Sequence, residues 1–181
     1  RYCLSVIWNE LNEARVVRTK IINKKIYSYE NAESSSEYKK ILNVYQKIWR
    51  NNIVNSHILI EQCMINANAF IAKYLIENCS EKALLRKSCF DGVWYLKYNK
   101  KSSNDHKPLN KNYYTHFTSP LRRYADQLVH RQILSILEKK NNIFEINDSC
   151  IVQMNSTKHY IKTIDSELKW ILLANPSSKT R

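Results

Sequence analysis

The stretch from Tyr114 to Arg131, YTHFTSPLRRYADQLVHR, constrains the fold of this chain more than any other. Its first residues are aromatic and polar without helical periodicity, and we expect them to be extended. Ser119 followed by Pro120 then predicts a helix start, because serine caps free backbone N–H groups and proline suits the first helical position. Apolar residues continue at helical spacing: Leu121, Tyr124, Ala125, Leu128, Val129 and Ile133. The stretch therefore predicts an extended segment that leads into an amphipathic helix.

Polar residues at the start of this predicted helix indicate an anion site. Arg122 lies in the expected first turn, where unpaired N–H groups and the positive end of the helix dipole attract anions. Its planar guanidinium can donate two hydrogen bonds to phosphate oxygens. Asp126 and His130 follow at intervals of four residues. We expect Asp126 to orient an arginine and His130 to pack against the helix, and we predict a phosphate site at Arg122.

The motif YTHFTSPLRRYAD, completed by Val129, His130 and Arg131, closely resembles that of the RNB-domain exoribonucleases, the ribonuclease II and ribonuclease R family. The resemblance extends over nearly the whole chain. It implies that residues 1–181 form a partial RNB catalytic domain, its C-terminal half, with an α+β fold. Without the resemblance, the same stretch would be a capped basic helix in an ordinary globular core.

The hydrophobic pattern of the remaining residues predicts short antiparallel strands packed against three to four long helices. We expect strands at residues 2–9 and 15–22, helices beginning near Ser36, at 56–75 and at about 152–174, and a polar basic loop at 99–112. In the last helix we expect these residues to point inward: Met154, Tyr160, Ile161, Ile164, Leu168, Ile171 and Leu172. No apolar run approaches the length of a membrane span.

Two further motifs carry the resemblance and imply contacts with RNA. Residues 60–68, IEQCMINAN, are similar to a family helix that lines the RNA channel. The resemblance therefore implies that Glu61 and Asn68 contact the ribose and backbone near the RNA 3′ end. On spacing alone, the two residues share an ordinary solvated helix face. The motif ALLRK makes Arg86 a further expected RNA contact.

The resemblance also assigns roles around the central motif. Arg122 and Arg123 would stabilise the charge that develops on phosphoryl oxygens during hydrolysis. Tyr114, His116 and Phe117 would pack against the terminal nucleotides, since stacking accepts any base, although Phe117 suits a core position equally well. The full set of implied RNA-binding residues is Glu61, Asn68, Arg86, Tyr114, His116, Phe117, Thr118, Ser119 and Arg131.

The activity implied is a Mg²⁺-dependent 3′→5′ exoribonuclease that degrades single-stranded RNA, with the Mg²⁺ ligands expected upstream of residue 1. The chain itself shows no paired-carboxylate spacing suited to a two-metal site, so we expect it to be inactive alone. Asp165 and Glu167 both compete for an active-site acid that relatives place on the last helix. One alternative is a degenerate relative that binds RNA without cutting it, as a subunit of an RNA-processing complex. Another is a DNA recognition helix at 119–137.

The charge of the chain agrees with a nucleic-acid partner. It has 29 Lys and Arg residues against 16 Asp and Glu, a formal net charge of +13, and such an excess suggests a polyanionic partner. A coding bias towards lysine would give the same excess, so charge alone does not decide. The five cysteines are scattered without a C-x-x-C pair. They indicate reduced thiols in an intracellular, cytoplasmic protein, with the nucleus and organelles left open.

Overall fold

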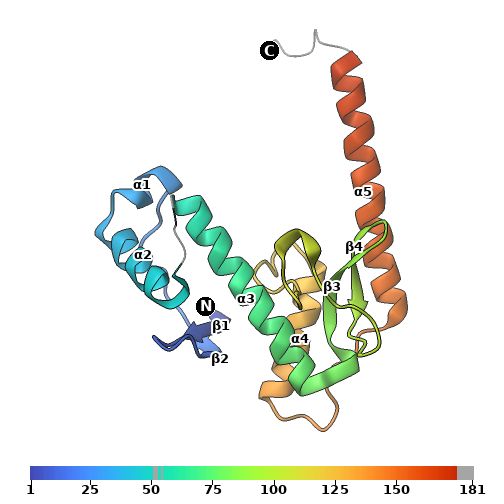
Figure 1. The fold of residues 1–181 in the computed structure, drawn as a ribbon, viewed down its shortest axis with the longest axis horizontal. Coiled ribbons are helices and arrows are strands. Elements are labelled where there is room, and N and C mark those ends of the chain that lie inside the picture. The colour runs from blue at the N-terminus through green and yellow to red at the C-terminus, as the bar shows by residue number, and fades with distance from the viewer. Residues whose placement is uncertain (51–52, 54, 175–181) are drawn as a thin grey trace.

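The computed structural model describes residues 1–50, 53 and 55–174 of the 181-residue chain. They form an α+β fold, as predicted, of helices and two separate antiparallel hairpins (Figure 1). The elements are β1 (Tyr2–Trp8), β2 (Ala14–Lys20), α1 (Tyr29–Glu33), α2 (Ser36–Trp49), α3 (Ser56–Cys79), the 3₁₀ helix η1 (Ser80–Lys82), β3 (Leu84–Cys89), β4 (Gly92–Lys97), the 3₁₀ helix η2 (Lys107–Leu109), α4 (Tyr124–Leu137) and α5 (Asp148–Ala174). In the described part of the chain, no helix is both long and apolar enough to cross a membrane.

The first hairpin confirms the two strands predicted at the start of the chain. β1 pairs with β2 in antiparallel register, from Tyr2 opposite Lys20 to Trp8 opposite Ala14. Alternate side chains point to one face of the hairpin, as the two-residue period of a strand requires. The connecting turn uses Asn12 with a φ of 62°, a left-handed conformation that asparagine tolerates better than most residues.

A second hairpin, formed by β3 and β4, was not predicted. Its strands pair from Leu84 opposite Lys97 to Cys89 opposite Gly92. Gly92 has a φ of 144°, a conformation that residues with a side chain rarely adopt, and it allows the tight turn. The strands are short, and β3 buries Lys87 to 4% exposure. Because a lysine stands at an inward position, the usual apolar alternation of a strand is obscured.

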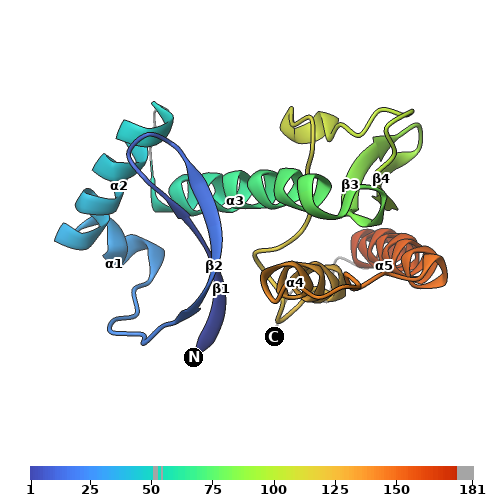
Figure 2. The same ribbon diagram turned by 90° about the horizontal axis from the view of Figure 1, so that it is seen from below.

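The main core lies where α3, α4 and the second hairpin meet. The predicted periodic helix at 56–75 is confirmed as the first part of α3, and Figure 2 shows α3 crossing the molecule between α4 and the loop that carries η2. Burial of an aliphatic side chain contributes about 1.5–3 kcal/mol. The side chains without exposed surface here include Ile71, Leu75, Leu84, Val129 and Ile133. This packing fixes the elements that flank the predicted site.

α4 begins at Tyr124, not at the predicted cap Ser119, and that prediction is wrong. Residues 119–122 form a turn instead, in which the Arg122 N–H donates to the Ser119 carbonyl at 3.2 Å. A Ser-Pro pair suits the first two positions of a β-turn as well as a helix start, so local sequence does not separate the two. Arg122 therefore precedes the helix and does not lie in its first turn.

The shifted helix start also corrects the predicted apolar stripe. Leu128, Val129 and Ile133 are buried as expected, but Leu121 is 97% exposed and Tyr124 is 50% exposed. Leu121 stands on the turn, where helical spacing no longer determines which way its side chain points. The buried stripe thus begins only after Tyr124.

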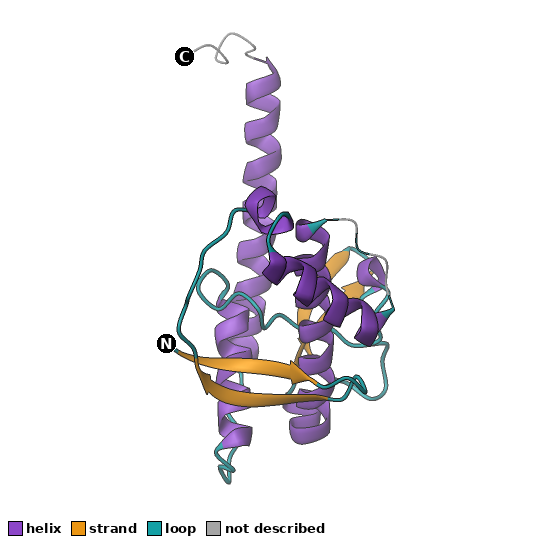
Figure 3. Cartoon of the chain, turned by 90° about the vertical axis from the view of Figure 1, so that its left-hand side faces the viewer, coloured by secondary structure: helices purple, strands orange, loops and turns teal. Residues whose placement is uncertain are grey.

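α5 is longer than predicted and extends away from the rest of the chain (Figure 3). Met154 packs against the core as expected. Tyr160 and Ile161, predicted to point inward, are 67% and 53% exposed, because this part of the helix faces solvent. The side chains of Leu168, Ile171 and Leu172 lie outside the described part of the chain. Asp165 and Glu167 are both exposed on α5, so neither side chain is buried against the central motif.

Candidate nucleic-acid interface

Residues 113–118 run as an extended segment beside β3 and are held there by hydrogen bonds. The Arg86 N–H donates to the Tyr114 carbonyl at 2.8 Å. The Thr115 hydroxyl donates to the Leu84 carbonyl at 2.7 Å, and Thr115 has no exposed surface. The segment is therefore fixed against the core up to the turn at 119–122.

The side chain of Asn68, on α3, holds the same segment from the other side. Its amide nitrogen donates to the Tyr114 hydroxyl at 2.8 Å. Its amide oxygen accepts the backbone N–H groups of Phe117 at 2.9 Å and Thr118 at 3.3 Å. Asn68 is only 2% exposed. It therefore supports the segment from within, which differs from the RNA contact expected of it.

A buried histidine, His116, links the segment to both strands of the second hairpin. Its Nε2 lies 2.6 Å from Nη1 of Arg86, and its Nδ1 lies 2.5 Å from the Tyr95 hydroxyl. Because a guanidinium can only donate, Nε2 must accept, and the proton of a neutral ring then sits on Nδ1. Burial raises the pKa of Tyr95 above its ordinary value. Sequence reasoning missed Tyr95, whose only signal is its place in an aromatic run.

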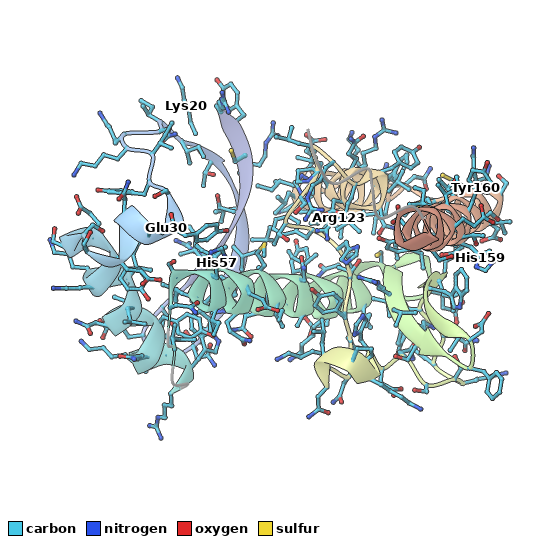
Figure 4. All side chains as sticks on the ribbon, turned by 90° about the horizontal axis from the view of Figure 1, so that it is seen from above. Lys20, Glu30, His57, Arg123, His159 and Tyr160 are labelled. Carbon is cyan, nitrogen blue, oxygen red and sulfur yellow. The ribbon has the colours of Figure 1, made fainter. Side chains whose placement is uncertain are left out.

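Asp126 binds the second arginine of the motif. This carboxylate has no exposed surface. Its oxygens accept Nε and Nη2 of Arg123, each at 2.8 Å, and one also accepts the Ser119 N–H at 2.7 Å. The expectation that Asp126 orients an arginine is confirmed. Arg123, at the start of α4 (Figure 4), therefore compensates a buried charge and ties the turn to the helix.

A groove of about 930 Å³ separates the first hairpin from the turn at 119–122. His130 closes one side of it, where its Nε2–H donates to the Phe117 carbonyl at 2.9 Å. Burial lowers the pKa of His130, against the opposing effects of this hydrogen bond and of the Asp126 charge. The residues that shape the groove include Arg1, Tyr2, Leu4, Arg18, Leu121 and Arg122.

The arginines of this groove differ in their partners. Arg18 forms an exposed ion pair with Glu138 at 3.0 Å. Arg122 is exposed, and its guanidinium makes no ion pair within the described part of the chain. An exposed pair such as that of Arg18 contributes about 0–1 kcal/mol, so an anionic ligand displaces it at little cost. The groove thus combines apolar walls with cations that can meet an anion.

The other predicted site residues divide into exposed and buried groups. Glu61 and Arg131 are exposed, and the Arg131 guanidinium lies 5.5 Å from the ring centre of Phe144. Tyr114, His116 and Phe117 are at most 6% exposed, so their expected stacking on nucleotides does not fit their burial. Phe117 instead belongs to the hydrophobic core, the alternative that the sequence left open for it. Tyr114 and His116 are hydrogen-bonded to Asn68 and Tyr95.

Among the described residues, no group of three or more His, Cys, Asp or Glu side chains is placed to hold a metal ion. The Asp126 carboxylate is already occupied by Arg123 and by the Ser119 N–H. The described residues therefore do not fit a metal centre. They can instead bind an anion through Arg1, Arg18 and Arg122, the arginines that line the groove.

Comparison with known proteins gives matches centred on the same segment. Residues 94–139 match the family model described as RNB domain. The chain is 40% identical over 65 residues to DIS3-like exonuclease 2 of Caenorhabditis elegans, covering 34% of this chain and 8% of that protein. It is 45% identical over 56 residues to ribonuclease R of Chlamydia pneumoniae, covering 31% of this chain and 8% of that protein. The chain thus spans less than a tenth of the length of these relatives.

A solved structure of yeast Ssd1, described as a pseudonuclease, has a similar fold. The two superpose with a TM-score of 0.69 over 85% of this chain and 31% of the Ssd1 chain, at 16% sequence identity. At that identity, the likeness concerns the fold. This fold likeness covers most of the chain, whereas the family model matches residues 94–139.

Proposed function

We infer that this chain, which belongs to the RNB-domain family, contacts single-stranded RNA through the groove beside Arg122 and takes part in its hydrolytic 3′→5′ degradation. The contrast between neighbouring arginines carries this proposal. Arg123 is bound to a buried carboxylate, whereas Arg122 is exposed on the adjacent turn. Of these two neighbouring arginines, Arg122 is therefore the one that is available to a phosphate.

The composition of the groove supports RNA as its ligand. Apolar side chains such as Tyr2 and Leu121 can pack against bases, which bind aromatic and apolar surfaces with little regard to sequence. Arg1, Arg18 and Arg122 line the same groove and can pair with backbone phosphates. A ligand with alternating flat apolar groups and negative charges matches this arrangement.

In the proposed reaction, the Arg122 guanidinium stabilises the charge that builds on the phosphoryl oxygens. Arg123 acts behind it by holding Asp126 and the turn. Glu61 and Arg131, both exposed, remain proposed RNA contacts. The proposed cofactor is Mg²⁺, with its ligands proposed to lie upstream of residue 1, since the described residues hold no group of side chains placed to bind a metal ion.

RNA binding without hydrolysis is a second candidate function. The fold likeness to Ssd1, whose structure is described as that of a pseudonuclease, favours it. The groove and Arg122 would serve such a binder equally well. The two functions differ only in whether bound RNA is cut.

The test uses the full-length protein with Mg²⁺ and a 5′-labelled single-stranded RNA, with the 181-residue chain as the expected inactive control. We expect stepwise release of nucleotides from the 3′ end. Arg122→Ala should lower kcat about 100- to 1000-fold, the effect of losing one transition-state donor. Arg122→Lys should restore little, because an ammonium lacks the two-point fork. RNA that is bound but never cut by the wild-type protein would establish the second candidate instead.

A further inference from the structure

A second basic hollow lies in the polar loop at 99–112, which the proposed function does not use. Its volume is about 550 Å³, and Lys100, Lys107 and Lys111 line it with one carboxylate, Asp105. None of these lysines makes an ion pair within the described part of the chain. The hollow therefore gathers three lysines against the single carboxylate of Asp105.

The loop is built on a hydrogen-bonded scaffold. The Asn104 side chain, 9% exposed, donates to the carbonyls of Asn99 at 2.7 Å and Ser102 at 2.8 Å. His106 and Lys111 form an isolated antiparallel bridge, with the His106 N–H donating to the Lys111 carbonyl at 2.7 Å. The lysines are thus presented on a preorganised backbone, which lowers the entropy cost of binding a ligand.

Further contacts anchor the loop to the second hairpin. The Lys107 N–H donates to the Ser88 hydroxyl at 2.8 Å, and the Ser88 N–H donates to the Asp105 carbonyl at 2.8 Å. Like charges held together on a fixed frame repel one another, so this arrangement lowers stability until an anion binds. A polyanion would relieve that repulsion.

The hollow and the Arg122 groove lie on different sides of the molecule. They share no lining residue, and Figure 2 shows α3 between α4 and the loop that carries η2. The extended segment 113–118 joins them. Ser119 lies eight positions after Lys111, and eight fully extended residue steps span at most roughly 29 Å. One RNA strand of sufficient length can therefore reach both places.

We propose that the loop at 99–112 is a second contact for the RNA backbone, which binds phosphates outside the Arg122 groove. The proposal takes RNA as the ligand from the proposed function, but the site is independent of Arg122. It requires that long RNA gains affinity from Lys100, Lys107 and Lys111, whereas RNA too short to leave the groove gains none.

The experiment measures the affinity of the 181-residue chain for single-stranded RNA of about 4 and about 16 nucleotides, lengths at the two ends of known single-strand site sizes. The variant K100Q/K107Q/K111Q removes the lysines of the hollow. The matched control K39Q/K40Q/K47Q removes the same charge from exposed positions on α2. Each affinity is measured over a range of salt concentrations.

We expect the hollow variant to bind the long RNA at least tenfold more weakly, with a log–log salt slope reduced by up to about 2, since each neutralised phosphate contributes roughly 0.7. Its affinity for the short RNA should not change. The control should lose less affinity for the long RNA than the hollow variant does, and its affinity for the short RNA should not change either. The melting temperature of the hollow variant at low salt should equal or exceed that of wild type. If the chain bound long RNA through these lysines but did not bind short RNA, the second contact would be confirmed. The proposed contact in the Arg122 groove would then be wrong.

Three outcomes would overturn the proposal. A control that loses as much affinity as the hollow variant would assign the loss to net charge. An equal loss of affinity for both RNA lengths would place the lysines in the groove contact. If the hollow variant bound long RNA with wild-type affinity, the loop would take no part in RNA binding. That result would leave the proposed RNA contact of Arg122 unaffected.

Discussion

The amide of Asn68 donates to the hydroxyl of Tyr114 at 2.8 Å, across the interface between α3 and the extended segment. The same side chain accepts two backbone N–H groups further along, at Phe117 and Thr118. One buried residue thus fixes both ends of the segment that leads to Arg122. The position of the proposed phosphate contact depends on this bond set.

Replacing Asn68 tests this support. Asn68→Ala leaves the buried N–H of Phe117 and the partly buried N–H of Thr118 without an acceptor, and an unsatisfied buried donor costs about 1–3 kcal/mol. We expect the free energy of unfolding in urea to fall by about 2–4 kcal/mol. Tyr114→Phe removes a single hydrogen bond and should cost only about 1 kcal/mol. Equal losses for the two variants would show that the backbone contacts of Asn68 contribute nothing.

The adjacent arginines should separate stability from RNA binding. Arg123→Ala leaves the Asp126 carboxylate buried without its ion-pair partner, and we expect a loss of about 3–5 kcal/mol in unfolding free energy. Arg122→Ala should change stability by less than about 0.5 kcal/mol, as is usual for exposed positions. In R123A/D126A the loss should be smaller than the sum of the single losses. A fully additive pair would contradict the role given to Arg123.

His130 should make stability depend on pH. Burial lowers its pKa in the folded state, so the unfolded chain takes up the proton first as the pH falls through its ordinary pKa of about 6.5. The free energy of unfolding should therefore decrease on going from about pH 7.5 to about pH 5.5, and the decrease should level off below the folded pKa. His130→Gln, which can still donate to the Phe117 carbonyl, should show a smaller decrease. An equal decrease in both proteins would exclude this linkage.

Much of the fold could be predicted because it depends on local periodicity. The first hairpin, α2 and α3 follow from apolar spacing, and the α+β class is confirmed. The helix start near Ser119 was misplaced, because the Asp126 carboxylate accepts the Ser119 N–H and stabilises a turn there. That bond depends on how α4 is buried, which the local sequence does not contain.

The segment that forms the site could be predicted from the sequence. Which of its side chains are buried and which are exposed could not be predicted. The motifs assign Asn68, Arg86 and His116 to one site, and all three belong to or contact the extended segment. Burial then decides which side chains face inward, and burial arises from packing of α3 against that segment. Tyr95, which bonds His116, lies in a strand whose pairing was not visible in the sequence.

The contact between Arg122 and an RNA phosphate is tested most directly by the salt dependence of single-stranded RNA binding by wild type and by Arg122→Ala. We expect a steep loss of wild-type affinity with salt, with a log–log slope of roughly −0.7 per phosphate neutralised. The Arg122→Ala slope should be shallower by about 0.7, one phosphate contact, while Lys39→Gln on α2 should leave it unchanged. A flat wild-type response, or identical slopes for wild type and Arg122→Ala, would contradict the assignment of Arg122 to an RNA phosphate.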